Sequence, residues 1–154
     1  MTREANFLKV EHELSGFTIE KLSRMMKLSF SRKLLANENI NITVDQWVCL
    51  KLLDQYGQMN QQQLSDHSLK DAPTLTRIID KLEAKALIAK APDPNDRRKT
   101  NLSLTDEGET MVARIKPILQ SFRSEVYSGI SASELHTMEE IIHKIFSNLN
   151  YLNQ

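Results

Sequence analysis

This chain of 154 residues is poor in cysteine, glycine and long apolar runs, and its formal net charge is zero. Its one cysteine excludes an intramolecular disulfide and is typical of a reducing compartment, so we expect a cytoplasmic protein. No stretch approaches the roughly 20 apolar residues of a membrane-spanning helix, and the N-terminus lacks a signal-peptide pattern. We therefore expect the chain neither to span nor to cross a membrane.

The scarcity of glycine removes the familiar enzyme motifs. The four glycines are isolated, so the chain contains no phosphate-binding loop and no dinucleotide-binding fingerprint. It also lacks Gly-x-Ser-x-Gly and His-Glu-x-x-His motifs. The four histidines are scattered, and only His136 and His143 could share a helix face, which is not the spacing of metal ligands. The sequence predicts no enzyme, no cofactor and no metal site.

A net charge of zero argues by itself against a nucleic-acid partner, but the charges are unevenly distributed. Residues 70–105 carry eight basic side chains against five acidic ones, whereas residues 106–154 carry four against seven. The most basic short cluster is Asn95–Lys99. An imbalance of this size also arises by chance, so alone it does not distinguish a DNA-binding face from an ordinary solvated surface.

The first part of the chain has the apolar periodicity of helices. We expect a helix over residues 5–36 that is interrupted at Gly16, with its firm part starting near Thr18. Two capping boxes then predict helices over about 44–56 and 61–67, the first of them ended by a glycine.

The segment 71–108 organises the rest of the chain. Asp71 as a cap residue and Pro73 in the first turn mark a helix start, and apolar residues at helical spacing follow. An apolar run at 87–89, a basic polar tip and the alternating segment 101–104 predict two strands joined by a basic loop. Two short helices joined by a turn of about four residues are the pattern of a helix-turn-helix, whose second helix is the candidate reader of DNA.

Two further amphipathic helices are expected towards the C-terminus. Thr105 caps the first, which should bend before Pro117, and a capping box of Ser131 and Glu134 opens the last. Together with the first helix they carry more apolar surface than the small central region can cover. This excess predicts a homodimer.

The segment DPNDRRKTNLSLTDEG, preceded by the helix TLTRIIDKLEAKALI, closely resembles the MarR family of bacterial winged helix-turn-helix repressors. The family pattern has an acidic residue and an arginine in the loop, then a hydrophobic–polar–Leu–Thr strand and an acidic-x-Gly helix start. The matching positions are Asp93, Asp96, Arg97, Arg98, Leu104, Thr105 and Gly108. The resemblance covers essentially the whole chain and implies a mainly α fold, in which an α/β winged helix-turn-helix is flanked by dimerisation helices.

The resemblance also implies the organisation and the role of the chain. It implies an N-terminal dimerisation helix (1–36), a winged helix-turn-helix DNA-binding region (37–105) and C-terminal dimerisation helices (106–154), together forming one intertwined domain. The expected function is that of a transcriptional repressor which binds an inverted-repeat operator in double-stranded DNA as a homodimer. A small aromatic or phenolic effector would release it.

The family geometry implies that the N-terminal turns of the second helix enter the major groove. The residues that would then face bases and phosphates are Pro73, Thr74, Thr76 and Arg77. Lys81 and Lys70 are expected to contact phosphates and to set the register. Without the loop motif, Arg77 and Lys81 would be interpreted as a solvated helix face.

In the loop between the strands, called the wing below, the resemblance assigns DNA contacts to Arg97 and Lys99. Arg97 would enter the minor groove, where a narrow A·T-rich groove attracts arginine. Arg98 would pair with Asp96 or Asp93 and anchor the loop; an exchange of the two arginine roles is the alternative.

The family's effectors bind between the dimer helices and the reader. The candidate lining residues are Met25, Met26, Phe30, Trp47 and Cys49. The competing interpretation is plain core packing, which is commoner for methionines and aromatics at helical spacing. Cys49 also raises the alternative of a thiol-based redox-sensing regulator, although its apolar neighbours favour an inert core cysteine.

A helical protein-interaction module without DNA binding is another alternative. It would explain the amphipathic ends of the chain but would leave the basic loop unexplained. The sequence also departs from the family at Ala86 and in the turn Ser68–Leu69, where glycine is common, and at Ala89 and Ala91, which replace charged residues.

Overall fold

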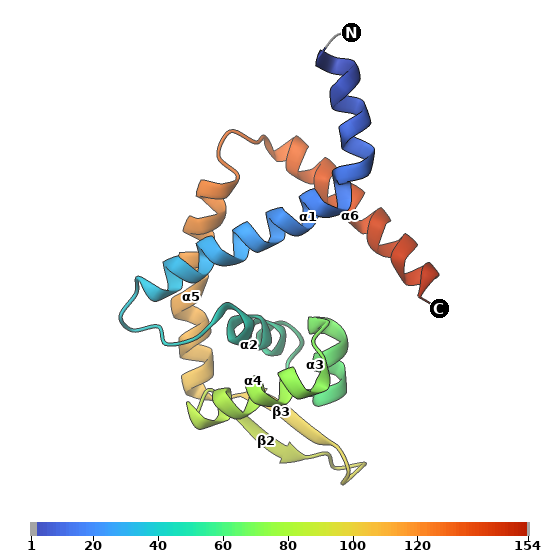
Figure 1. The fold of residues 1–154 in the computed structure, drawn as a ribbon. Coiled ribbons are helices and arrows are strands. Elements are labelled where there is room, and N and C mark those ends of the chain that lie inside the picture. Colours follow the sequence, from blue (N-terminus) through green and yellow to red (C-terminus); the bar gives the residue numbers. More distant parts are fainter. Residues whose placement is uncertain (1–2, 154) are drawn as a thin grey trace. The chain divides into compact units, whose positions relative to one another are not determined.

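The computed structural model describes the backbone of residues 3–153 and the side chains of residues 16–153. The chain falls into two compact units, Met1–Gln120 and Ser121–Gln154. The helices are α1 (Arg3–Leu35), α2 (Val44–Tyr56), α3 (Gln61–Ser68), α4 (Ala72–Ala84), α5 (Asp106–Val126) and α6 (Ala132–Leu152). The strands are β1 (Met59–Asn60), β2 (Ile88–Pro92) and β3 (Thr100–Leu104), as Figure 1 shows. The fold is thus the predicted winged helix-turn-helix with flanking helices.

Local sequence signals fix the helix ends in the first unit. Thr43 and Gln46 form the predicted capping box of α2, with reciprocal hydrogen bonds of 3.1 and 3.2 Å between backbone N–H and side-chain oxygen. Asn60 and Gln63 do the same for α3, at 2.9 Å in both directions. Gly57 ends α2 with a φ of 75°, a conformation that favours glycine.

The predicted interruption at Gly16 is wrong, because α1 runs without a break from Arg3 to Leu35. Glycine inside a helix costs roughly 0.5–1 kcal/mol relative to alanine, which is too little to end a helix whose other residues favour it. The side chains of the predicted helix before Gly16 lie outside the described residues.

The sheet has the order β1-β3-β2, and both pairings are antiparallel. The predicted hairpin is present, with Ile88 opposite Leu104 and Pro92 opposite Thr100. Strand β1, in which Met59 pairs with Leu102, was not predicted, because two residues are too few to show the apolar–polar alternation of a strand. The buried side chain of Met59 ties the start of α3 to the middle of the hairpin.

The core of the first unit fixes which face of α4 remains in solvent. Leu75, Ile78, Ile79 and Leu82 of the predicted apolar face of α4 are buried. Ala86, the fifth residue predicted for this face, lies beyond the end of the helix and is exposed, because the chain turns there with a positive φ. The four buried residues belong to a core of side chains from every element of this unit, which includes Phe30, Leu34, Ile42, Trp47, Leu50, Leu53, Met59, Leu64, Leu87, Ile88, Leu102, Val112 and Ile115. The other face of α4 is therefore held outward by burial rather than by its own propensity.

Among the described residues, two other than glycine adopt the left-handed conformation. Leu69, in the turn between α3 and α4, has φ 52°, and Ala86, after α4, has φ 56°. Both lie in turns at which an expected glycine is missing. Each turn forms nevertheless, at a cost of roughly 1–2 kcal/mol for a residue that carries a Cβ.

The second unit consists of the end of α5, a turn through Gly129 and α6. The predicted capping box is present: the Ser131 N–H donates to Glu134 Oε2 at 2.8 Å, and the Glu134 N–H donates to Ser131 Oγ at 3.3 Å. No residue of α6 is buried. Its exposed large apolar side chains are Met138, Ile141, Ile142, Ile145, Phe146, Leu149, Tyr151 and Leu152.

Candidate nucleic-acid interface

The start of α4 is fixed by its cap and by the turn before it. Asp71 Oδ2 accepts the Thr74 N–H at 3.2 Å, as the sequence predicted for an N-cap. Hydrogen bonds from the side chain and the backbone of Thr74 hold the pKa of Asp71 below its ordinary value. Ser65 Oγ donates to the Lys70 carbonyl at 2.7 Å and so closes the turn between α3 and α4. These contacts set the angle at which α4 leaves the turn.

The five residues predicted for the recognition helix are all exposed on α4: Pro73, Thr74, Thr76, Arg77 and Lys81. Within the described part of the chain, Arg77 and Lys81 make no hydrogen bond or ion pair through their side chains. Thr76 is held, because its hydroxyl accepts a hydrogen bond of 2.8 Å from Gln61 Nε2. The structure thus brings these side chains onto one outward face, with two free cations.

Two carboxylates on the same helix share one lysine ammonium from strand β2. Lys90 Nζ, on β2, lies 2.6 Å from Glu83 Oε2 and 2.9 Å from Asp80 Oδ1. The hydrogen bonds to Glu83 and Asp80 raise the pKa of Lys90. Sequence reasoning missed this cluster, since only the packing of β2 against α4 brings the three side chains together. It reduces the repulsion that α4 would otherwise present to a polyanion.

Lys70, predicted as a phosphate contact, already has a partner. Its Nζ lies 2.7 Å from Asp45 Oδ1, and its side chain is only 19% exposed. Lys27, on α1, reaches the same carboxylate at 2.9 Å. Partial burial raises the pKa of Asp45, but the hydrogen bonds from Lys70 and Lys27 outweigh it and lower the pKa overall. A phosphate at Lys70 would therefore share that ammonium with Asp45.

The wing is held by an aspartate and an asparagine on either side of its tip. Asp93 Oδ1 accepts the N–H groups of Asn95 and Asp96 at 2.8 and 3.0 Å. Its Oδ2 accepts Asn101 Nδ2 at 2.9 Å. The Asn95 N–H, followed by Asn101 and the Asp96 N–H, lowers the pKa of Asp93. Asn101 was not predicted as a site residue, because its amide has no motif until the strand pairing places it near Asp93.

Arg97, Arg98 and Lys99 are all exposed around this tip, and Asp96 is half-buried. Arg98 Nε lies 3.4 Å from Asp96 Oδ1, and the Arg98 side chain is 93% exposed. A long, exposed ion pair of this kind contributes little. The Arg97 side chain makes no hydrogen bond or ion pair with any described residue. Figure 1 shows the loop at the end of the β2–β3 hairpin that lies away from α5.

The strand-to-helix motif has a structural role at the base of the wing. Thr105 Oγ1 donates to the Ala86 carbonyl at 2.5 Å and accepts the Gly108 N–H at 3.0 Å, which confirms the predicted cap of α5. The Thr105 N–H donates to the Leu87 carbonyl at 3.2 Å. A Cβ at Gly108 would lie 2.0 Å from that same carbonyl oxygen. The end of α4, the hairpin and the start of α5 are therefore joined at one point.

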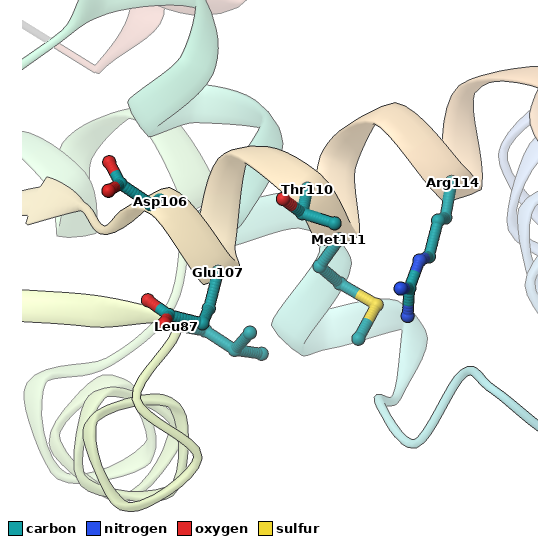
Figure 2. Close-up of a pocket in the computed structure, with 6 residues that line it drawn as sticks. All are labelled: Leu87, Asp106, Glu107, Thr110, Met111 and Arg114. Carbon is teal, nitrogen blue, oxygen red and sulfur yellow. The ribbon is translucent and has the colours of Figure 1, made fainter.

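Two surface cavities lie beside α5. Figure 2 shows the first, of about 260 Å³, which is lined by Leu87, Asp106, Glu107, Thr110, Met111 and Arg114. The second, of about 360 Å³, is lined by Asn37, Glu38, Asn39, Ile40, Arg114 and Ile118. Neither is lined by a residue predicted for the effector site. Of those five residues, Phe30, Trp47 and Cys49 are buried, Met26 is half-buried and Met25 is 56% exposed.

Cys49 is fully buried in the core, with 0% of its surface exposed. Desolvation raises the pKa of its thiol to about 11, although the charge of Lys70 opposes this. The thiolate, which is the reactive form, is therefore scarce at neutral pH.

We expect Cys49 to resist alkylation by iodoacetamide in the folded protein at pH 7.5 and to react fully in 6 M guanidinium. Mass spectrometry of the alkylated cysteine checks both outcomes. Rapid modification of the folded protein, or loss of DNA binding on treatment with peroxide, would restore the redox-sensing alternative. The Cys49→Ser variant serves as the control for reaction at other groups.

Over the part of the chain that the structure describes, every helix is too short or too polar to span a membrane. No three histidine, cysteine, aspartate or glutamate side chains there are grouped so that they could hold a metal ion.

Comparison with known proteins bears directly on the interface. The family model described as MarR family matches residues 42–100, which run from the residue before the α2 cap through the wing. The match therefore includes α4 and the loop with Arg97.

Solved structures share the fold over most of the chain. A cysteine-to-serine mutant of MarR from E. coli, complexed with operator DNA, has a TM-score of 0.79 at 22% identity, over 88% of this chain and 96% of that one. PcaV from Streptomyces coelicolor, in complex with its natural ligand, has a TM-score of 0.74 at 21% identity, over 86% and 91%. BpsR from Bordetella bronchiseptica, whose DNA binding is regulated by 6-hydroxynicotinic acid, has a TM-score of 0.70 at 22% identity, over 83% of this chain and 98% of that one.

Proposed function

We propose that this chain represses transcription by binding an inverted-repeat operator as a homodimer. Through residues 42–100 it belongs to the MarR family of winged helix-turn-helix transcriptional regulators. The family consists of DNA-binding regulators and not of enzymes. A regulator of this kind works on the chromosome, so we place it in the cytoplasm. The observation that carries the proposal is the exposed face of α4 on the same unit as the wing, with Arg77, Lys81 and Arg97 unpaired among the residues whose side chains the structure describes.

The recognition helix would supply the sequence-specific contacts. Arg77 lies opposite the buried face of α4 and has a guanidinium free to bind guanine O6 and N7 bidentately. Lys81, one turn further on, would contact a phosphate, and Lys70 would do so while it is shared with Asp45. Pro73 and Thr74 lie in the first turn, where a helix approaches the bases most closely.

The wing would read the shape of the adjacent minor groove. The hydrogen bonds of Asp93 hold the loop in one conformation, so that ordering Arg97 and Lys99 on DNA costs less entropy. Arg97 would insert into the groove, while Asp96 accepts the backbone N–H of Arg98 at 3.1 Å and so helps to hold the loop.

A second copy of the chain would supply the other half-site. One short helix and one wing make too few contacts for specific affinity, and two half-sites about one helical turn apart double them. The exposed apolar side chains of α6 supply the surface that a partner would cover.

A small aromatic or phenolic effector would shift the spacing of the two recognition helices and so release the operator. Among the solved structures with this fold, PcaV is in complex with its natural ligand, and the DNA binding of BpsR is regulated by 6-hydroxynicotinic acid. Met25, Met26, Phe30, Trp47 and Cys49 remain our candidate lining residues, and the buried ones would need the dimer helices to move for a ligand to reach them.

The proposal is tested by fluorescence anisotropy with duplex DNA from upstream of the gene that encodes the chain. We expect Arg77→Ala to weaken specific binding by about 1–3 kcal/mol, roughly 5- to 150-fold, per half-site, and to relax the preference at one base pair of each half-site. Arg97→Ala should reduce the salt slope by about one phosphate equivalent per wing. Specific binding unaffected by either variant would remove α4 and the wing from the interface.

A control is Lys51→Ala, which removes an exposed cation of α2 outside α4, the wing and the expected dimerisation helices. It should leave affinity and salt slope unchanged. A wild-type chain that shows no specific, salt-sensitive DNA binding but captures a protein partner would favour the protein-interaction module.

A further inference from the structure

The hydroxyl of Thr76 is engaged within the protein. Thr76 Oγ1 donates its hydrogen to the carbonyl oxygen of Ala72, one turn earlier in α4, at 2.9 Å. The same oxygen accepts a hydrogen bond of 2.8 Å from Nε2 of Gln61, at the start of α3. A threonine hydroxyl has one hydrogen to donate and two acceptor lone pairs. Its only hydrogen and one of its lone pairs are therefore already used.

These two bonds fix the side chain of Thr76 and leave its methyl group and one lone pair of its oxygen unused. Rotation about χ1 would break both hydrogen bonds, and a β-branched side chain in a helix has few rotamers available. Thr76 is nevertheless exposed on α4. What this residue offers to a ligand is a rigidly held methyl group and not a hydrogen-bond donor.

We propose that Thr76 is a specificity-determining residue that recognises thymine through methyl–methyl contact, an inference that rests on the proposed function. Gln61 is the residue that positions Thr76. Thymine is the base whose major-groove edge carries a C5-methyl group. A threonine with a free hydroxyl could donate instead to guanine or to the O4 of thymine. Because the Thr76 hydroxyl donates its hydrogen to the Ala72 carbonyl, it cannot donate to a base. The neighbouring Arg77 would supply the hydrogen bonds to the bases.

The experiment combines changes in the protein with changes in the DNA. Footprinting on DNA from upstream of the encoding gene first locates the binding site, and short duplexes that contain this site are then prepared. In these duplexes each thymidine is replaced in turn by deoxyuridine, which lacks only the C5-methyl group. For the wild-type chain we expect one thymine in each half-site at which the replacement weakens binding by about fourfold, the value for one buried methyl.

Two variants of Thr76 separate its methyl group from its hydroxyl. Thr76→Val keeps a methyl but loses the hydroxyl and with it the bond from Gln61; it should bind within about threefold of the wild type and keep a deoxyuridine penalty at that thymine, reduced as in Gln61→Ala. Thr76→Ser keeps the hydroxyl and loses the methyl; it should bind more weakly and show no penalty there. Gln61→Ala should reduce the penalty at that thymine alone, which a merely structural role would not do.

The outcomes distinguish this inference from the proposed function. If the wild-type chain binds its site but Thr76→Val loses more than tenfold while Thr76→Ser does not, the hydroxyl makes the contact and the inference is wrong. If no deoxyuridine position depends on residue 76, Thr76 does not determine specificity. If the wild-type chain shows no specific binding at all, the proposed function fails, and the inference with it.

Discussion

Replacing Gly108 with alanine should lower the free energy of unfolding by about 2–3 kcal/mol, although the substitution puts a better helix former into α5. The added Cβ would lie 2.0 Å from the Leu87 carbonyl oxygen, where no unbonded carbon fits. That oxygen belongs to the backbone and accepts the Thr105 N–H, so it cannot move away without breaking the junction. Alanine gains about 1 kcal/mol of helix propensity over glycine, which offsets only part of the clash.

Urea denaturation followed by circular dichroism measures this change. A loss of 2–3 kcal/mol should also lower the melting temperature by roughly 4–12 °C for a chain of this size. Gly16→Ala is the matched control, because a Cβ at Gly16 meets nothing within 4 Å and lies inside α1. It should stabilise the protein by about 0.5–1 kcal/mol. A Gly108→Ala variant as stable as the wild type would contradict the geometry of the junction.

This junction shows why a sequence motif could be recognised before its reason was known. The family's Leu–Thr–x–x–Gly spacing predicted a strand followed by a helix start, and Thr105 does cap α5. What the spacing could not reveal is that Thr105 also binds Ala86 and that Gly108 rests against Leu87. Those partners lie about twenty residues away in the chain, and only the folded hairpin brings them together.

The same distinction holds for the fold as a whole. Helix ends that depend on residues three apart, such as Thr43 with Gln46, were predicted correctly because the interaction is local. Strand β1 was missed because Met59 has its place through pairing with Leu102, forty-odd residues away. The interruption expected at Gly16 was wrong because a local propensity of under about 1 kcal/mol was taken as decisive.

In the candidate interface, the exposed side chains were easier to predict than their partners. Arg77 and Arg97 follow from a helix face and a loop motif, both visible in the sequence. The contact of Lys90 with Asp80 and Glu83, and that of Asn101 with Asp93, depend on how β2 and β3 pack. Sequence reasoning therefore named the residues expected to meet DNA, which stay predictions, and overlooked those that hold them in place.

Replacing Ile145 with glutamate should convert the proposed homodimer into monomers. Ile145 lies near the centre of the exposed apolar stripe of α6, three and four residues from Ile142, Ile141 and Leu149. A partner that covers this stripe would enclose an unpaired carboxylate from each copy, which costs about 3–5 kcal/mol or drives its protonation. The dimer dissociation constant should rise by at least about 100-fold, as sedimentation equilibrium at micromolar concentration would show.

Ser147→Glu is the control, because it places the same charge on the opposite face of α6, and it should leave the dimer intact. No residue of α6 is buried within the single chain, so Ile145→Glu should keep its helical circular dichroism.

A folded monomer presents one recognition helix and one wing, so its affinity for the full operator should fall by at least about 100-fold. Its salt slope should drop to about half of the wild-type value, since half as many phosphates are contacted. A variant that stays dimeric and binds like the wild type would show that α6 does not form the interface, and the excess apolar surface of α6 would then require a partner other than a second copy.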